Sequence, residues 1–415
     1  MKPFLSAHAT HPDWRVALAL AAAQIEAQRA EVPGALHPTL GWVYLTDHFA
    51  GAADELLAEL QRRWPGVAWV GAVGVGIAAG AVEYMDEPAL ALMLGAIGRD
   101  RFQVFHGRQP LRRFAAQTAM VHADPASSEL AELVADLADR TSSGYLFGGV
   151  ASSRWTATDG TSTARHLADG VWQGGVSGVA FDAGVALVSR VTQGCQPIGP
   201  SREVTEADRQ VVVALDGEPA LDCLLRDLAM EGAEPRDAVP RLRQTLVGLR
   251  DPAAPDPSRP ERALRGDAFG DETRVRHLIG LDPARRAIAV GDAVEPGMRL
   301  AFCHRNTEAA RRDLTRICAE VREEVEPESA AIALPALPNR ADAERSAVAS
   351  GIAGALYVSC AGRGGAHFGA PSAELAIVRH ALGDVPLVGF FAAGEIANRH
   401  LYGYTGVLTV FRAVP

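Results

Sequence analysis

Residues 354–365 read G-A-L-Y-V-S-C-A-G-R-G-G, an apolar run that ends abruptly in a glycine-rich turn. The apolar run Gly354–Cys360 predicts a strand, and the three glycines that follow permit backbone conformations with positive φ, which other residues resist. A helix is expected next, because Pro371 and Ser372 suit its first turn and its cap. The stretch therefore predicts a strand, a turn and a helix in succession.

A second strand is expected after that helix, where Val385–Phe391 reads V-P-L-V-G-F-F and leads into A-A-G-E-I. Glu395 lies in this second turn, directly after Gly394, and a third strand closes the segment at Gly403–Phe411. Two loops are therefore predicted to meet at strand ends, one with Arg363 and one with the glutamate.

The same order of elements is found near the N-terminus. A strand is predicted at Gly41–His48, a helix follows, and Val67–Gly76 then reads V-A-W-V-G-A-V-G-V-G. In both copies the predicted glycine loop has the pattern V-G-x-x-x-x-G. Its glycines are Gly71 and Gly76 in one copy and Gly389 and Gly394 in the other. We interpret this as internal duplication.

Two weaker copies extend the pattern. One begins with the strand at Thr118 and ends with G-Y-L-F-G-G, which contains Gly148 and Gly149. A fourth is predicted to open at Met298 and continue into the helix Thr307–Val321. The fold class that follows is α/β (α+β), with mixed, largely antiparallel sheets built from duplicated strand-helix-strand units. The chain is expected to consist of two pseudo-equivalent halves that meet near residue 220.

Composition excludes several classes of protein. The 415 residues carry a formal net charge of −10 without a basic block, so a nucleic-acid partner would meet repulsion. The five cysteines are too scattered for a disulfide framework or a C-x-x-C site, which favours a reducing cytoplasm. The longest uncharged run, Trp64–Val82, contains Pro65 and five glycines, which favours strands over a membrane span. The twelve histidines are scattered, so no protein-only zinc site is predicted.

The glycine-rich turn after Cys360 is the best candidate for chemistry. Such a turn before a helix presents several backbone N–H groups to one anion, and Arg363 adds a planar fork that matches a carboxylate. Glu395, in the facing loop, would accept hydrogen bonds from an ammonium group. The candidate ligand-binding residues are Cys360, Gly362, Arg363, Gly364, Gly394, Glu395, Gly71, Gly76, Gly148 and Gly149. The alternative is structural: Arg363 and Glu395 pair with each other and brace the two loops.

Cys360 has an enzymatic alternative. At a strand end near Arg363, its thiol would be acidified into a nucleophile or a redox sensor. His367 and His400 are possible neighbours, although the spacing selects neither as a base, and a free cysteine is commonly a small buried apolar residue. A His or a carboxylate within hydrogen-bond reach of the thiol is the feature that would favour a thiol enzyme.

The chain resembles the FIST family, whose members combine an N-terminal and a C-terminal FIST domain. The resemblance is carried by C-A-G-R-G-G-A-H-F-G at Cys360–Gly369, P-L-V-G-F-F-A-A-G-E-I at Pro386–Ile396 and L-Y-G-Y-T-G-V-L at Leu401. It implies a FIST N-terminal domain at 31–220 and a FIST C-terminal domain at 221–415. These would follow a strand and helix in 1–30, and the second domain would contain a proline-rich surface loop at 232–262. Ala361 and Asn306 depart from the family pattern, which usually has Asn and Asp at these positions.

The resemblance implies an intracellular sensory module in signal transduction that binds an amino acid or a similar small carboxylate-bearing ligand. The two halves use up the length of the chain, so a separate output protein such as a histidine kinase is the expected partner. Some family members bind haem and sense nitric oxide. No histidine here lies in a recognisable haem motif, so no cofactor is expected, and a haem-based nitric oxide sensor remains the alternative within the family.

Overall fold

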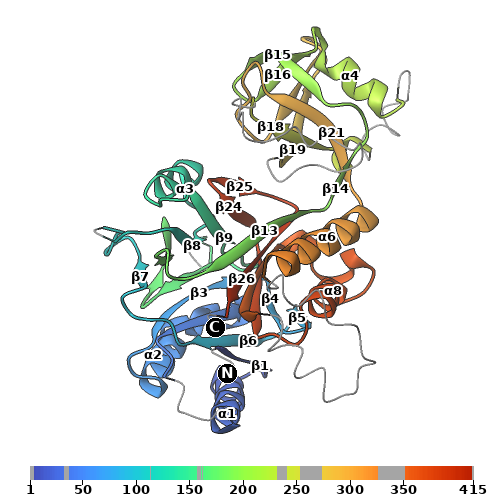
Figure 1. Cartoon of the computed structure of the whole chain (residues 1–415). Coiled ribbons are helices and arrows are strands. Elements are labelled where there is room, and N and C mark those ends of the chain that lie inside the picture. The colour runs from blue at the N-terminus through green and yellow to red at the C-terminus, as the bar shows by residue number, and fades with distance from the viewer. Residues whose placement is uncertain are drawn as a thin grey trace. The chain divides into compact units, whose positions relative to one another are not determined.

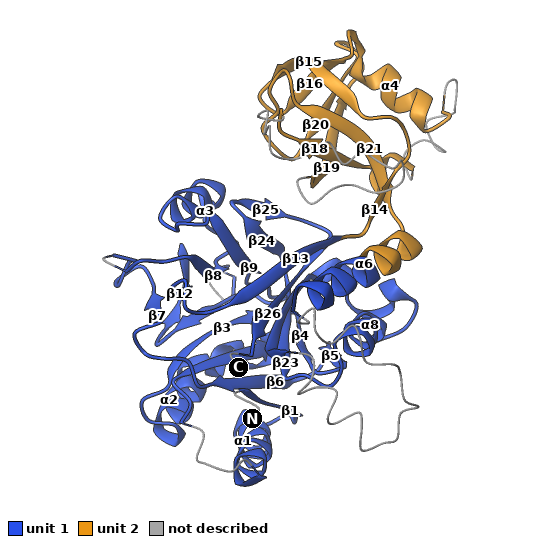
Figure 2. Ribbon diagram, in the orientation of Figure 1, with its two compact units in different colours: residues 1–192, 314–415 blue, residues 193–313 orange. Residues whose placement is uncertain are grey.

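The computed structural model describes residues 4–31, 37–112, 114–156, 160, 162–230, 241–252, 273–325 and 351–413. These fall into two compact units, with residues 1–192 and 314–415 in unit 1 and residues 193–313 in unit 2 (Figure 2). The mixed α/β class with mixed, mostly antiparallel sheets is confirmed. Most of the predicted proline-rich loop at 232–262 lies outside the described residues.

Unit 1 contains three six-stranded sheets (Figure 1). Sheet 1 has the order β1 (Phe4–Thr10), β6 (Ala89–Gly95), β2 (Leu40–Thr46), β3 (Ala68–Gly74), β10 (His166–Ala168) and β11 (Val171–Trp172). Sheet 2 has the order β25 (His400–Tyr402), β24 (Gly394–Asn398), β9 (Tyr145–Val150), β8 (Thr118–Ala123), β12 (Val176–Phe181) and β7 (Phe102–Phe105). Sheet 3 has the order β13 (Leu187–Gln193), β26 (Thr405–Arg412), β22 (Ile352–Cys360), β23 (Leu387–Ala392), β4 (Gly76–Ala79) and β5 (Val82–Met85).

The two central strands of each sheet are parallel, and the strands beside them are antiparallel. A helix joins each parallel pair, as such a connection requires a crossover. These helices are α2 (Ala53–Arg63), α3 (Leu130–Ala138) and α8 (Ala373–Leu382). The helices α1 (Trp14–Glu31) and α6 (Thr307–Val325) precede β2 and β22, and short 3-10 turns lie at η1 (Asp47–Ala52), η3 (Ala361–Arg363) and η4 (Gly365–Phe368). Within the described part of the chain, no helix has the length and apolar character needed to cross a bilayer.

The three sheets exchange hairpins in a closed circle. Strand β3 of sheet 1 continues into β4–β5, which pairs with β23 of sheet 3. Strand β23 in turn continues into β24–β25, which pairs with β9 of sheet 2, and the chain after β9 leads to β10–β11, which pairs with β3 of sheet 1. The predicted third copy is confirmed as β8, α3 and β9.

The predicted fourth copy is wrong. Its strand is β21 (Arg299–Arg305), which pairs antiparallel inside unit 2, and the helix after it, α6, leads into β22 of sheet 3. Helix α6 therefore occupies the same place in its repeat as α1 does before β2. A strand followed by a helix is found both in a true copy of the unit and in β21 with α6. The two differ only in the strand with which the first strand pairs, and the sequence does not show that.

The repeated glycines lie in strands, and the prediction that they form loops is wrong. Gly71, Gly148 and Gly389 hold the same position in the three parallel pairs, each beside a residue of the preceding central strand. A Cβ atom at any of the three would lie well inside contact distance of that neighbour's carbonyl oxygen. Glycine is needed here because two backbones approach closely.

The main core of unit 1 is formed by side chains from all three sheets. Tyr44 of β2 stacks on Phe390 of β23, with ring centroids 5.2 Å apart. The imidazole of His122 in β8 contacts both rings and lies 3.2 Å from the Tyr44 hydroxyl. A second core lies between the other face of sheet 1 and the apolar sides of α1 and α2.

Unit 2 is a closed antiparallel barrel. The ring of pairings runs β15, β16, β20, β19, β18, β21 and back to β15. Its elements are β14 (Cys195–Pro197), β15 (Arg202–Asp208), β16 (Val211–Leu215), β17 (Glu218–Pro219), α4 (Ala220–Asp227), β18 (Leu246–Arg250), β19 (Arg274–Asp282), β20 (Ala287–Val290) and β21. The boundary expected near residue 220 falls between β17 and α4, inside this unit.

Candidate functional site

The carboxyl ends of the three parallel pairs converge at one place, where each chain leaves its sheet for the next. We call residues 73–76, 150–153 and 391–394 the crossover junction. Ser152 N donates to Val73 O at 3.1 Å, and Ala393 N donates to Val150 O at 3.0 Å. Ligand sites in sheets with parallel strands commonly form outside the carboxyl ends, at the point where connections diverge. The surroundings of this junction are therefore the candidate site.

The structure brings most of the predicted site residues to this junction. Cys360 and Gly394 lie at the ends of strands there, and Glu395 pairs with Gly149 across β24 and β9. Gly362 and Gly364 lie in the turn after β22, and Gly76 begins β4. Gly71 and Gly148 lie farther back, inside their strands.

Arg363 has an internal carboxylate partner, but that partner is Glu374 of α8 and not Glu395. Nε of Arg363 donates to Glu374 Oε1 at 2.8 Å, and Nη2 lies 2.7 Å from the same oxygen without hydrogen-bond alignment. Only 1% of each side chain is exposed. Burial alone would lower the pKa of Arg363, but the charge and hydrogen bond of Glu374, together with the charges of Tyr357 and Glu395, outweigh it and raise that pKa, so the guanidinium stays ionised.

Glu374 also anchors the strand before the turn. Its Oε1 accepts a hydrogen bond from Tyr357 Oη at 2.7 Å, and its Oε2 accepts one from Ser359 Oγ at 3.0 Å. The guanidinium of Arg363 lies over the ring of Phe368, 5.0 Å from its centroid. This set of contacts connects β22, the turn and the first turn of α8.

The anion position of the glycine-rich turn is filled by a carboxylate of the chain itself. Glu83 of β5 accepts a hydrogen bond from Gly365 N at 3.0 Å, and its own backbone N donates to Ser372 Oγ at 3.1 Å. Burial, with the nearby charge of Glu374, raises the pKa of Glu83 despite the backbone hydrogen bonds that lower it. The turn thus binds a carboxylate of the β4–β5 hairpin, whereas the sequence predicted that it would bind a ligand anion.

Glu395 is a strongly perturbed group of the site. Its side chain is fully buried, and Oε2 accepts hydrogen bonds from Thr405 N at 3.1 Å and Thr405 Oγ1 at 2.7 Å. Oε1 has no hydrogen-bond partner among the described residues, although the Cys360 thiol lies close enough to affect its titration. Burial raises the pKa of Glu395 to about 8, against the hydrogen bonds of Thr405 and the charge of Arg363, which lower it.

The Cys360 thiol is not activated. Burial, and next the charge of Glu395, raise its pKa to about 12, although the backbone N–H groups of Gly362 and Tyr404 act in the opposite direction. Glu395 is the carboxylate neighbour that a thiol enzyme would need, but its charge disfavours the thiolate.

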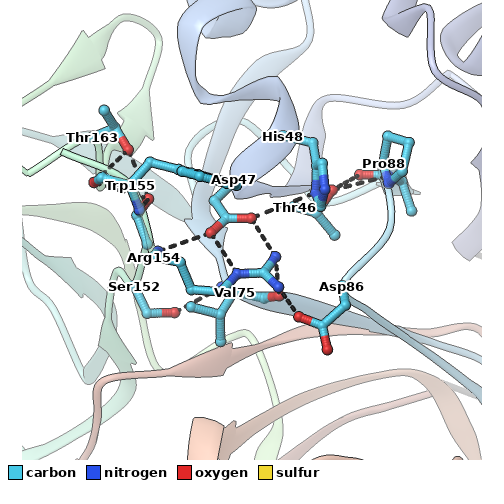
Figure 3. A network of polar contacts seen from close by, with 12 residues as sticks. Thr46, Asp47, His48, Val75, Asp86, Pro88, Ser152, Arg154, Trp155 and Thr163 are labelled. Carbon is cyan, nitrogen blue, oxygen red and sulfur yellow. Dashed lines mark hydrogen bonds and ion pairs between the residues drawn. The ribbon is translucent and has the colours of Figure 1, made fainter. Parts of the chain in front are cut away.

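A second polar network at the junction was missed by the sequence reasoning (Figure 3). Arg154, just after β9, donates from Nε to Asp47 Oδ2 at 3.0 Å and from Nη2 to Asp47 Oδ1 at 2.7 Å, and it also pairs with Asp86. The side chain of Asp47 is fully buried at the end of β2, and His48 lies beside it. The sequence contains one clue, an acidic residue directly after the strand, but nothing in it identifies the distant arginine.

The two buried histidines do not fit a haem. His122 is fully buried between Tyr44 and Phe390, and its Nδ1 has no hydrogen-bond partner within the described ranges. His166 is 1% exposed, and its ring nitrogens contact Ser177 Oγ at 2.6 Å and Gly174 O at 3.2 Å. Packed rings of this kind leave no open position for an iron ligand. The described residues also contain no cluster of three or more His, Cys, Asp or Glu side chains arranged to hold a metal ion.

Comparisons with known proteins match the chain to two family models, whose boundary falls inside unit 2. The model of the FIST N domain matches residues 39–218, and that of the FIST C domain matches residues 220–398. An uncharacterized protein of Mycobacterium tuberculosis is 31% identical over 430 residues, covering 97% of each chain. An uncharacterized protein of Mycobacterium bovis is 31% identical over 416 residues, again covering 97% of each chain.

Proposed function

The chain belongs to the family of proteins that combine a FIST N domain with a FIST C domain, and from this premise we propose that it senses a small ligand in signal transduction. The observation that carries the proposal is Glu395, a fully buried carboxyl group with one oxygen unpaired among the described residues. Leaving a buried polar atom without a partner costs about 1–3 kcal/mol, so such an atom in a native site calls for an explanation. A ligand that donates to Oε1 would remove this cost.

The ligand class that we propose is an amino acid or a similar small molecule. Its ammonium group would bind at Glu395, where Cys360 and Tyr404 are partly exposed and Ala393 is exposed. A ligand carboxylate at Arg363 would have to compete with Glu374, which already holds the guanidinium.

The signal would pass to a separate output protein, and a histidine kinase is one such partner. All five cysteines are free, in keeping with the reducing cytoplasm that we propose as the compartment. We propose that sensing is not enzymatic and needs no haem. An absorption spectrum of the purified protein incubated with haem tests the last point, and a sharp Soret band that disappears on replacing one histidine would overturn it.

A thermal-shift screen of the purified full chain against amino acids, small acids and small amines tests the proposed function. A ligand at one hundred times its dissociation constant adds about 2.7 kcal/mol to the apparent stability, which is readily measured. The Glu395→Gln variant should lose the shift, and Glu129→Gln, which alters an exposed carboxylate, should keep it. A screen in which no compound changes the melting temperature, or in which Glu395→Gln responds like the wild type, would refute the proposal.

A further inference from the structure

The groups that would bind a ligand carboxylate at this site are already engaged. Arg363, the cation beside Glu395, is paired with Glu374 at 2.7 Å and is almost completely buried. The amide of Gly365, the donor predicted to bind an anion, donates to Glu83 at 3.0 Å. A carboxylate-bearing ligand would therefore have to displace one of two internal carboxylates.

A positively charged group of a ligand would find a hydrogen-bond acceptor at this site. Glu395 Oε1 is fully buried and lacks a hydrogen-bond partner in the part of the chain that the structure describes, while Oε2 is held by two donors from Thr405. Because Oε2 is fixed, the direction of Oε1 is fixed too. The Cys360 thiol is close enough to lower the pKa of Glu395, but it makes no aligned hydrogen bond to Oε1, so this oxygen is oriented to accept from a stronger donor.

The charge around this oxygen also favours a cation. Three carboxyl groups, Glu83, Glu374 and Glu395, belong to one electrostatic cluster. The charge of Glu374 affects Glu83, and the charges of Glu374 and Glu395 both affect the guanidinium of Arg363. If all were ionised, the set would carry an excess of negative charge in a buried place, which is costly without a further positive group. Burial raises the pKa of Glu395, and protonation of this group would reduce the excess of negative charge.

The position is close to solvent in spite of its burial. The residues beside Glu395 include Ala393, which is exposed, and Cys360 and Tyr404, which are partly exposed. Cys360 influences Glu395 directly, and the backbone of Tyr404 contacts the thiol. A small group that moved these two side chains aside would reach Oε1 without unfolding the sheet.

We propose that the group recognised at this site is the protonated primary amine of the ligand, bound by Glu395 Oε1, and that a ligand carboxylate is not required. This inference rests on the proposed sensing function and specifies its ligand class. The ammonium group donates N–H hydrogen bonds to the ionised carboxylate, and Glu395 releases its proton to solvent as the amine binds. No covalent bond is formed or broken apart from that O–H bond.

Matched sets of small molecules test the requirement. One set contains alanine, ethylamine and propionate, and a second contains norvaline, butylamine and pentanoate, so that each amino acid is compared with its amine and its acid. We expect amines to raise the melting temperature at least as much as the amino acids do, and the acids to have no effect. If an acid or another compound without an amine stabilises the protein and the amines do not, the inference is wrong and the sensing function stands. If no compound in these sets or the wider screen binds, the sensing function itself is refuted.

Proton release gives a second, independent measurement. Calorimetry of amine binding in buffers of different ionisation enthalpy should show close to one proton released per amine near neutral pH. Below the pKa of Glu395, the dissociation constant should fall by about tenfold for each unit by which the pH rises, because ionised Glu395 is the binding form. The Glu395→Gln variant should lose this dependence, and the control Glu129→Gln should retain it. Should Glu395→Gln fail to fold, the wild-type measurement still decides, because binding that neither releases a proton nor tightens with rising pH would overturn the proposal.

Discussion

At the scale of single residues, the internal carboxylate partner of Arg363 differs from the one that the sequence predicted. The sequence predicted a ligand carboxylate for this arginine or, as the structural alternative, a pair with Glu395, and the partner in the structure is Glu374. A glutamate in the first turn of a helix has an ordinary structural explanation, since it favours the helix N-terminus. Its distance from Arg363 depends on how α8 packs on β22, which local patterns do not report.

Replacing Arg363 tests its bracing role. Arg363→Ala leaves Glu374 buried without its cation, so we expect a loss of about 3–5 kcal/mol in the free energy of unfolding. Arg363→Lys should recover part of that loss, because a point charge lacks the planar fork. Denaturant unfolding measures both, with Arg379→Ala as the control at an exposed arginine. Near-normal stability combined with lost ligand binding would instead assign Arg363 to recognition.

Buried titratable residues predict a stability maximum in mildly acidic solution. Burial lowers the pKa of His166 to about 4 and that of His122 to about 3, so the unfolded chain binds more protons below about pH 6.5 and stability falls as the pH drops. For His166 the loss is about 3 kcal/mol by about pH 4. Glu395 acts oppositely, since its raised pKa of about 8 makes the native state bind more protons above about pH 4.5, and stability falls as the pH rises.

Two variants separate these contributions. Unfolding free energies measured across the pH range should show that Glu395→Gln lessens the decline toward pH 8 and leaves the acid side unchanged. His166→Asn should lessen the acid decline and leave the alkaline side unchanged. A wild-type stability that does not vary between about pH 4.5 and pH 8 would contradict the assignment, since both groups titrate differently in the two states there.

At the scale of elements, a single hydroxyl completes the crossover junction. Direct backbone hydrogen bonds join two of the three pairs of segments that form the junction. The third pair, 73–76 with 391–394, is joined through Ser152, whose Oγ accepts from Val75 N at 2.9 Å and donates to Phe391 O at 2.6 Å. Ser152→Ala leaves both groups without this partner, and we expect a cost of about 1–3 kcal/mol. Thermal or denaturant unfolding should detect it, with Ser128→Ala, at an exposed serine, as the control. Equal stability of the two variants would mean that water replaces the bridge.

The glycines of the parallel pairs make a sharper prediction. In Gly389→Ala the new Cβ would clash with the carbonyl of Tyr357, and because both groups belong to the backbone of sheet 3, the strands must separate. We expect a loss above about 4 kcal/mol, or a failure to fold, which is exceptional for one methyl group. Gly51→Ala, where nothing lies within 4 Å of the added atom, should be nearly neutral. Expression level and melting temperature compare the two, and a stable, well-expressed Gly389→Ala would show that the strands have room.

These glycines also explain what the sequence could and could not predict about the fold. Their spacing revealed the repeat, and the strands and helices around them were placed correctly. Glycine serves both for positive φ in turns and for close approach in strands, and the letter alone does not distinguish the two. For that reason Gly71 and Gly389 were assigned to loops although they lie in strands. The circular pairing of hairpins was not predicted, because it depends on contacts between distant segments.

At the scale of the whole molecule, unit 2 is an insertion within the repeat that contains β22 and β23. The chain enters it through β14 and leaves through β21, and these strands pair with each other. Near the same place Asn306 N donates to Gly194 O at 3.0 Å, and Gln193 N donates to Asp313 Oδ2 at 2.7 Å. The entry and exit of the unit are therefore held together inside the unit itself, as is typical of a tolerated insertion.

The barrel should consequently fold when it is separated from the rest. A fragment of residues 193–313 has a closed ring of strands and a core of its own, so we expect a cooperative unfolding transition and dispersed amide resonances. Far-ultraviolet circular dichroism and NMR measure both. A fragment that remains unstructured at all temperatures would show that the barrel depends on unit 1.

The circular exchange of hairpins also limits how early the chain can fold while the ribosome is making it. Sheet 1 has all its strands once residue 172 has emerged, but β4–β5 must wait for β23, and β9 must wait for β24 near the end of the message. At about 5–20 residues per second, the early hairpin stays unpaired for roughly tens of seconds. During that interval its edge is open to pairing with other nascent chains, which is a route to aggregation that the finished sheet closes.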